Sequence, residues 1–145
     1  MEELMEMRAL LEAGRLPEAM LLLDELDEMA KDDKINKIGS HLKILLLHLI
    51  KQAAEQRSTS SWEVSIANAV DAIQASNKRR KAGGFYLTTD ELCEAITEAY
   101  RPALRLASLE SFKGELSPKE LGQLVNATAV QDQALALLLA PTSPL

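Results

Sequence analysis

Three helix-start signals recur between residues 60 and 120 and most strongly constrain the fold of the chain. Each is a Ser or Thr followed three residues later by Glu: Ser60 with Glu63, Thr88 with Glu91, and Ser117 with Glu120. In such a capping box the hydroxyl accepts a hydrogen bond from the third backbone amide of a helix, and the Glu carboxylate accepts one from the amide of the Ser or Thr. Pro118 stands at the first helical position, where proline is favoured. The chain is therefore expected to be a series of helices.

The apolar residues are of the kinds that pack between helices. Hydrophobic residues make up 47% of the 145 residues, but aromatic residues only 3%. Leu, Ala and Met are good helix formers, whereas β-sandwiches and barrels rely on β-branched and aromatic side chains. A chain of this length fits one domain and can bury a substantial core. The sequence predicts an all-α, single-domain bundle of four to six helices.

Glycines, prolines and capping residues set the expected helix ends. We expect helices over about 2–13, 17–31, 33–56, 61–81, 89–109 and 118–139. The helix over 33–56 contains the most apolar run of the chain and is expected to be the long central helix. Gly39 and Pro102 are expected to loosen, kink or split their helices, and Asn126 to break the last one. Residues 1–110 would form the core of the bundle, and 111–145 a helical extension and frayed tail of the same domain.

Negative charge is concentrated at the N-terminus. Residues 1–33 contain eleven acidic and three basic side chains, a net charge of −8, whereas the whole chain has −6, which leaves +2 for the rest. The first two helices are expected to form a hairpin that turns at Gly14, with Ala19 at their contact. An acidic surface disfavours non-specific binding of nucleic acid and favours either solubility or a basic protein partner.

The termini and apolar runs indicate a soluble, cytoplasmic protein without a membrane partner. The longest apolar runs, 44–50 and 134–140, are far shorter than the roughly 20 residues that span a bilayer. The N-terminal segment is acidic, whereas a signal peptide is basic and then apolar. A single cysteine, Cys93, excludes an internal disulfide and is expected to be a small helical core residue.

The only two histidines, His41 and His48, lie seven residues apart on the central helix. Seven residues separate them by about 10.5 Å along the helix axis, too far for one shared metal ion. On a helical wheel, one arc of about 120° carries the polar stripe: Lys37, Ser40, Lys43, Lys51 and Glu55, with Leu47 inside it. The rest of the wheel, Ile44 included, is mainly apolar. Both histidines are therefore expected at the edge of the core, with a ring nitrogen hydrogen-bonded or in water.

Two pairs of carboxylates have the spacing of one helix face: Glu25 with Glu28, and Glu91 with Glu94. Helical carboxylate pairs can bind divalent metal ions, which prefer several oxygen ligands. The alternative function is therefore a metal-dependent hydrolase, or a nuclease component of toxin or antitoxin type, that uses these carboxylates and His48. We expect a solvated or partner-binding acidic face instead, with no metal and no cofactor.

Two aromatic residues are candidate anchors of an interface. Trp62 and Tyr100 are expected either to pack against neighbouring helices or to contact a partner, because Trp and Tyr dominate binding hot spots. The candidate functional or interface residues share a polar or aromatic side chain on a predicted helix: Glu25, Glu28, His48, Glu55, Trp62 and Tyr100.

A series of sequence blocks over about residues 5–110 resembles a known family. The blocks are "LLEAGRL", "LDELDEMAKDDKINKIGSHLKILLLHLIK", "RSTSSW" and "EAITEAYRPA". Their order and spacing are similar to those of the domain of unknown function 29 family, small helical proteins common in cyanobacteria. That family usually has an aromatic residue where this chain has Gln52. The resemblance implies a helical bundle and supplies no activity.

Without a catalytic constellation, the expected function is that of a small, non-enzymatic adaptor or regulatory protein. It would act through helix-mediated contacts with another protein, and a homodimer is a further expectation. The apolar stripe of residues 121–139 would either pack on the bundle or enter a groove of the partner.

Overall fold

The computed structural model describes residues 2–79 and 83–141. The elements are α1 (Glu2–Glu12), α2 (Leu16–Glu55), α3 (Ser60–Asn77), α4 (Thr89–Glu110), the 3₁₀ turn η1 (Ser111–Gly114), α5 (Pro118–Gln123) and α6 (Ala127–Leu139). Over these described ranges no β-strand forms, and an isolated antiparallel bridge joins Lys78 to Phe85. The prediction of an all-α fold with up to six helices and a long central helix is confirmed.

The central helix α2 is longer than predicted. It runs without interruption from Leu16 to Glu55, so the predicted boundary between residues 31 and 33 is wrong. The residues around that boundary include no glycine or proline, and nothing there stops helix propagation. Gly39 does not interrupt the helix either, because its cost of about 1 kcal/mol is small against the packing of the buried residues that follow it. Within the described ranges, no helix is both long and apolar enough to cross a membrane.

The chain divides into two compact units, Met1–Lys34 and Ile35–Leu145. The first unit contains α1 and the start of α2, and the second contains the rest of α2 and all later elements. The elements after residue 110 pack within the second unit, since α5 and α6 both contact α4. The separation of a core over 1–110 from an extension over 111–145 stays a prediction.

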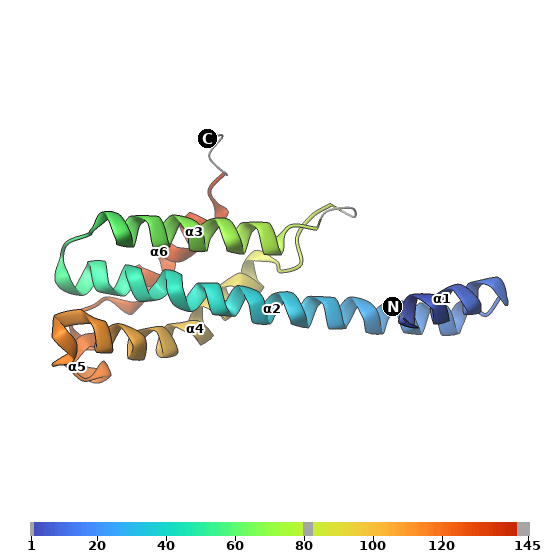
Figure 1. The fold of residues 1–145 in the computed structure, drawn as a ribbon, viewed down its shortest axis with the longest axis horizontal. Helices are drawn as coiled ribbons and strands as arrows, with labels where there is room; N and C mark the ends of the chain where they lie inside the picture. Colours follow the sequence, from blue (N-terminus) through green and yellow to red (C-terminus); the bar gives the residue numbers. More distant parts are fainter. Residues whose placement is uncertain (1, 80–82, 142–145) are drawn as a thin grey trace. The chain divides into compact units, whose positions relative to one another are not determined.

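The first unit is a helical hairpin, drawn in blue in Figure 1. Gly14 closes its turn with a φ of 75°, a left-handed conformation that glycine adopts without steric cost. The backbone amide of Arg15 donates to the carbonyl of Leu10 over 2.9 Å, which satisfies the end of α1. Ala19 is the one buried residue among the described residues of this unit. The turn at Gly14 was predicted correctly, and Ala19, which was predicted at the contact of the two helices, is buried.

The second unit contains the hydrophobic core. Its most deeply buried large side chains come chiefly from α2: Ile38, Leu42, Leu45, Leu46, Leu49 and Ile50. Helix α6 packs against both α3 and α4 and buries Val130, Ala134 and Leu138 (Figure 1). The apolar stripe of residues 121–139 therefore packs on the bundle, which was one of the two predicted outcomes.

Two of the three predicted capping boxes are confirmed. Thr88 and Ser117 each accept from the third amide of their helices, and the glutamates three residues later accept from the capping residues' amides. The first box is wrong by one residue. The N-cap of α3 is Thr59, whose hydroxyl accepts from the amide of Trp62, while Glu63 accepts from the hydroxyl of Ser58.

Three further predictions, at Pro102, at Asn126 and at the end of α3, have different outcomes. Helix α4 passes through Pro102 unbroken. The break at Asn126 is confirmed, and its side chain caps α6. Helix α3 ends at Asn77, earlier than predicted, because the Asn77 side chain bonds the backbone of Leu87. Residues 80–82, which include part of the predicted helix end, lie outside the described residues.

After α4 the backbone makes a left-handed turn that the sequence does not predict. Phe112 and Lys113 have φ values of 49° and 58°, and Gly114 follows at 75°. Only the glycine adopts such angles without a steric cost. Ser111, at the start of this turn, is buried, and its Oγ has no hydrogen-bond partner among the described residues.

Candidate functional site

Lys51, in the second unit, forms an ion pair in which the lysine is buried and the carboxylate of Glu110 is about half exposed. Its ammonium donates to Oε1 of Glu110 over 3.0 Å, and its side chain is 8% exposed. The same ammonium lies 4.7 Å from the centre of the Trp62 ring, whose negative face attracts a cation. The prediction that Lys51 belongs to a solvent stripe is wrong, because Trp62 and Glu110 enclose it. Two further assignments from the helical wheel are wrong. Leu47, which was predicted within the solvent stripe, is buried, and Ile44, which was predicted in the core, is exposed.

Arg57 joins two of the predicted candidates. Its Nε donates to Oε1 of Glu55 over 3.0 Å, and its guanidinium lies 4.7 Å from the centre of the Trp62 ring. Trp62 thus contacts two cations and is itself buried. These contacts hold the turn between α2 and α3 together, and they leave little of the indole on the surface for a partner.

A second set of hydrogen bonds closes the same turn. Gln52 Nε2 donates to Ser58 Oγ over 2.8 Å and to Glu63 Oε1 over 3.2 Å, and Ser58 Oγ donates to that Glu63 oxygen over 2.7 Å. Gln56 between them has a φ of 52°, which reverses the chain. The three side chains bond one another across this reversal, so their role is to fix the turn.

Both histidines lie where the sequence placed them, at the edge of the core. Each is half-buried, and Nδ1 of His48 lies 2.9 Å from the carbonyl oxygen of Ile44 one turn earlier. Among the described residues, no three His, Cys, Asp or Glu side chains gather as metal ligands do. His48 is thus held by its own helix and is not brought to Glu55 or Trp62 by any hydrogen bond of the described chain.

The predicted carboxylate pairs lie in different units. Glu25 and Glu28 are exposed on the hairpin, whereas Glu91 and Glu94 begin α4 in the second unit. Oε1 of Glu91 accepts from the amide of Thr88 over 3.1 Å, so this carboxylate is part of the capping box. A hard cation needs several oxygens around one point, and neither unit supplies them from these pairs alone.

Tyr100 is a core residue of the second unit. It is buried within the hydrophobic cluster. Burial disfavours the charged phenolate and so raises the pKa of Tyr100 above its usual value of 10.0. Tyr100 therefore packs against its own helices and does not stand on the surface as an anchor.

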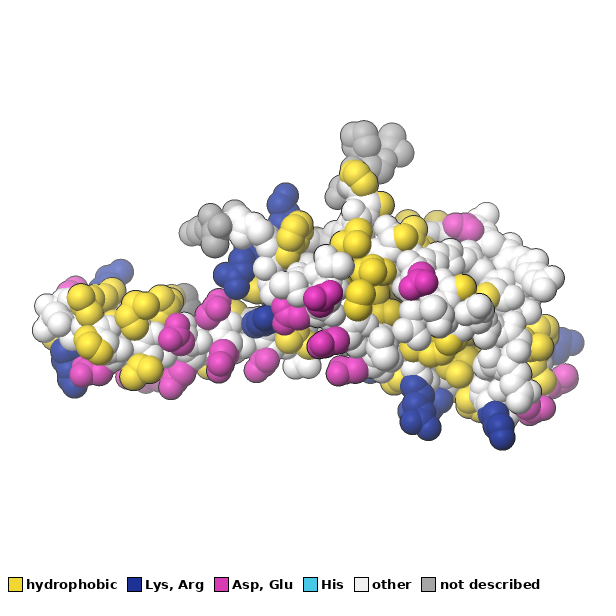
Figure 2. Space-filling view, turned by 180° about the vertical axis from the view of Figure 1, so that it is seen from behind, with side chains coloured by type: hydrophobic (Ala, Val, Ile, Leu, Met, Phe, Trp, Pro, Cys, Tyr) yellow, Lys and Arg dark blue, Asp and Glu magenta, His cyan; other side chains and the backbone are white. Residues whose placement is uncertain are grey.

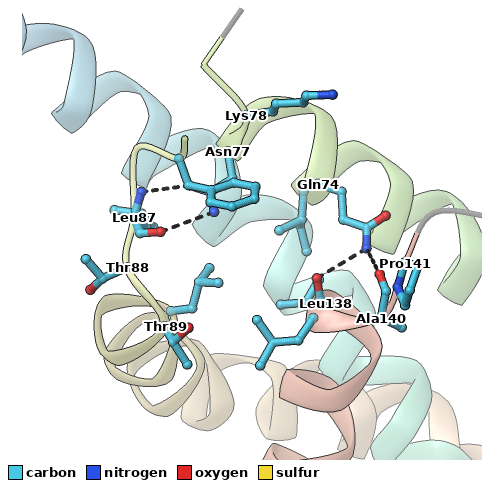
Figure 3. Close-up of a pocket in the computed structure, with 13 residues that line it drawn as sticks. Gln74, Asn77, Lys78, Leu87, Thr88, Thr89, Leu138, Ala140 and Pro141 are labelled. Atoms are coloured by element: carbon cyan, nitrogen blue, oxygen red, sulfur yellow. Dashed lines mark hydrogen bonds between the residues drawn. The ribbon is translucent and has the colours of Figure 1, made fainter. Parts of the chain in front are cut away.

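A pocket of about 620 Å³ lies where the ends of α3, α4 and α6 meet (Figure 3). Apolar side chains line much of the pocket, and two side-chain amides form hydrogen bonds between the elements that surround it. Gln74 Nε2 donates to the carbonyls of Leu138 and Ala140, and Asn77 bonds both backbone groups of Leu87. Specific small-molecule sites present a few placed polar groups to the ligand. Here those amides bond the surrounding elements to one another, and the other polar side chains that line the pocket are Lys78, Thr88 and Thr89.

The hairpin of the first unit leaves most of its large apolar side chains exposed. We call these eight residues the hairpin surface: Leu4, Met5, Leu11, Leu16, Met20, Leu21, Leu23 and Met29. They are half of the exposed large hydrophobic residues of the described chain. Helix α1 buries none of its residues. A hairpin of this length is too small to form a core that would bury these side chains.

The hairpin surface is bordered by acidic side chains. At 100° per residue, Leu16, Met20 and Leu23 fall within about 60° of one another on α2. Asp24 is exposed next to Leu23 on the same helix. In Figure 2 the hairpin carries a row of apolar side chains with acidic side chains beside it. Contiguous exposed apolar patches of this kind mark interaction sites on soluble proteins.

A family model described as "Domain of unknown function DUF29" matches residues 6–132. The chain belongs to this family. No curated protein and no solved structure shows significant similarity to it. The DUF29 match begins within α1 and ends within α6, so both units of the chain are parts of the family's pattern. It also extends beyond residue 110, where the blocks that suggested the family end.

Sequence reasoning on this DUF29 chain missed two features and found a third in part. It missed the Lys51–Glu110 pair, because the two residues are 59 positions apart and nothing local links them. It missed the exposure of the hairpin's leucines and methionines, although a short hairpin rich in large apolar residues was a signal that no core would cover them. It did find the acidic charge that surrounds them.

Proposed function

We propose that this protein is a non-enzymatic adaptor or regulator that binds another protein through its N-terminal hairpin. The observation that carries the proposal is the hairpin surface, eight large apolar side chains exposed on a unit whose described residues bury only Ala19. Covering one such side chain is worth about 1.5–3 kcal/mol, so a partner that covers several gains substantial binding free energy.

The charge of the hairpin specifies the chemistry of the partner. Residues 1–33 have a net charge of −8. A complementary surface presents apolar side chains flanked by Lys and Arg, as a basic amphipathic helix does. Nucleic acid is disfavoured by the same charge, because phosphate binding needs a basic surface.

Affinity capture from the native host tests the proposal with matched variants. Leu16→Gln/Met20→Gln/Leu23→Gln removes the apolar strip, and Asp24→Lys reverses one charge beside it. Ile44→Gln/Val64→Gln changes two exposed apolar residues of the second unit and is the control. All three variants should keep the thermal unfolding of the wild type, because the altered side chains are exposed.

We expect capture of the specific partner, quantified by mass spectrometry, to fall at least about tenfold for both hairpin variants and to be unchanged for the control. The purified partner should bind more weakly as salt concentration rises. Equal capture by all variants would contradict the proposal, as would hydrolytic activity that depends on His48, Glu25 or Glu28 in a folded chain.

A further inference from the structure

A second apolar surface lies at the end of α4, in the other unit. Leu106, Leu109 and Phe112 follow one another at intervals of three residues, and all three are exposed. Leu109 is 72% exposed, as much as any large hydrophobic residue of the described chain. Helix α4 contacts α5 and α6, and its Ala103 and Ala107 are fully buried. The three side chains are therefore left over after the bundle has packed.

Exposed arginines border this surface, in contrast to the acidic hairpin. Glu98 is an exposed carboxylate one turn before Arg101. Arg101 and Arg105 are exposed one helical turn apart, and Arg105 lies one turn before Leu109. Neither guanidinium forms an ion pair in the part of the chain that the structure describes. The neighbouring carboxylate of Glu110 is bound to Lys51 and so does not cancel their charge. We call Arg101, Arg105, Leu106, Leu109 and Phe112 the α4 face.

The backbone at the end of the α4 face is strained. Phe112 and Lys113 both have positive φ values, and the Oγ of buried Ser111 has no partner among the described residues. Strained conformations persist only where the surrounding structure enforces them, and they cluster at functional sites. Phe112, within this turn, is partly exposed.

We propose that the α4 face binds the hairpin surface of a second copy of this chain. This inference rests on the proposed function, since it names a partner for the hairpin. The two surfaces are complementary in charge: the hairpin carries the chain's excess of acid, and the α4 face adds two arginines to its apolar side chains. Contact between two hairpins would instead bring two segments of net charge −8 together, and like charges repel. The contact is heterologous, because a different surface of each copy takes part.

Molar mass by light scattering, across a concentration series, tests the contact. The wild type should assemble as concentration rises, and the assembly should weaken with salt. Arg105→Glu/Leu109→Glu disables the α4 face, and Met20→Glu/Leu23→Glu disables the hairpin surface. Each variant alone should be monomeric, whereas Val64→Glu, an exposed position on α3, should assemble as the wild type does.

Mixing the two disabled variants gives the most specific result. The first retains an intact hairpin and the second an intact α4 face, so the mixture should form a one-to-one complex held by a single contact. A mixture that stays monomeric, or a wild type that is monomeric throughout, overturns this inference. A monomeric wild type whose hairpin variants nevertheless lose a different, basic partner overturns the inference alone and leaves the proposed function standing.

Discussion

Lys51 illustrates what a helical wheel omits. The wheel assigns a residue to a face, but the environment of that face depends on which distant residues pack against it. Trp62 and Glu110 come from α3 and the end of α4, and together they enclose a lysine that the local pattern assigns to solvent. The histidines were predicted correctly at the edge of the core, where both are half-buried, and the contact of His48 Nδ1 is with Ile44 of its own helix.

Removing the partner of Lys51 should destabilise the second unit. Glu110→Gln leaves an ammonium that is 8% exposed without its carboxylate, and we expect the free energy of unfolding to fall by about 1–2 kcal/mol. Lys51→Met removes the charge itself and should cost less. Urea denaturation measures both, with exposed Lys43→Met as the control. If Glu110→Gln leaves the free energy of unfolding unchanged, the ion pair contributes nothing to stability.

Tyr100 should give the protein an alkaline limit of stability. Burial raises the pKa of the Tyr100 phenol in the folded state above 10.0, so the unfolded chain loses this proton first. The contribution is present below pH 10.0 and is lost as pH rises from there through the folded-state pKa. Denaturation from pH 8 to 11, about the range around a phenol pKa, should show a smaller alkaline loss for Tyr100→Phe than for the wild type. An equal alkaline loss of stability in the two proteins would contradict the burial of Tyr100 as its cause.

At the scale of the element, local signals decide how well a boundary is predicted. Thr88 and Ser117 begin their helices as predicted, since a capping box contains both of its partners within four residues. The start of α3 shifts by one residue because Ser58 competes for Glu63, which the motif alone does not reveal. The continuity of α2 was missed although the residues around the predicted boundary between 31 and 33 include no glycine or proline that would end a helix.

The corrected N-cap predicts a difference between two adjacent residues. Thr59→Ala removes the acceptor of the Trp62 amide and should lower the free energy of unfolding by about 1 kcal/mol. Ser60→Ala, one residue inside the helix, should change it by less than about 0.5 kcal/mol. Thermal or urea unfolding of the two variants decides between them, and a larger loss for Ser60→Ala would restore the first assignment.

The left-handed turn after α4 predicts a stabilising substitution. Lys113 has a φ of 58°, and glycine adopts this angle without the steric cost that a side chain incurs. Lys113→Gly should therefore raise the melting temperature, with a gain of about 0.5–1 kcal/mol. Lys119→Gly, within helix α5, should instead destabilise the protein by a similar amount. Destabilisation by both would show that the turn at Lys113 is not strained.

At the scale of the whole molecule, the two units differ in what they bury. The second unit covers its apolar residues with its own helices, so its fold could be predicted from amphipathic periodicity and helix caps. The first unit buries little more than Ala19. The periodicity of apolar residues along a helix does not distinguish a face that packs internally from one that is exposed to a partner. The acidic charge of the hairpin was visible in the sequence, but its apolar surface became evident only with the structure.

The central claim is that the hairpin is a protein-binding surface, and amide hydrogen exchange tests it most directly. Exchange would be followed along the full chain, free and saturated with the purified partner. The proposal predicts new protection within residues 2–34, and none there when Leu16, Met20 and Leu23 are all replaced by Gln. A complex that forms with protection gained only beyond residue 34, or with the hairpin unchanged, would contradict it.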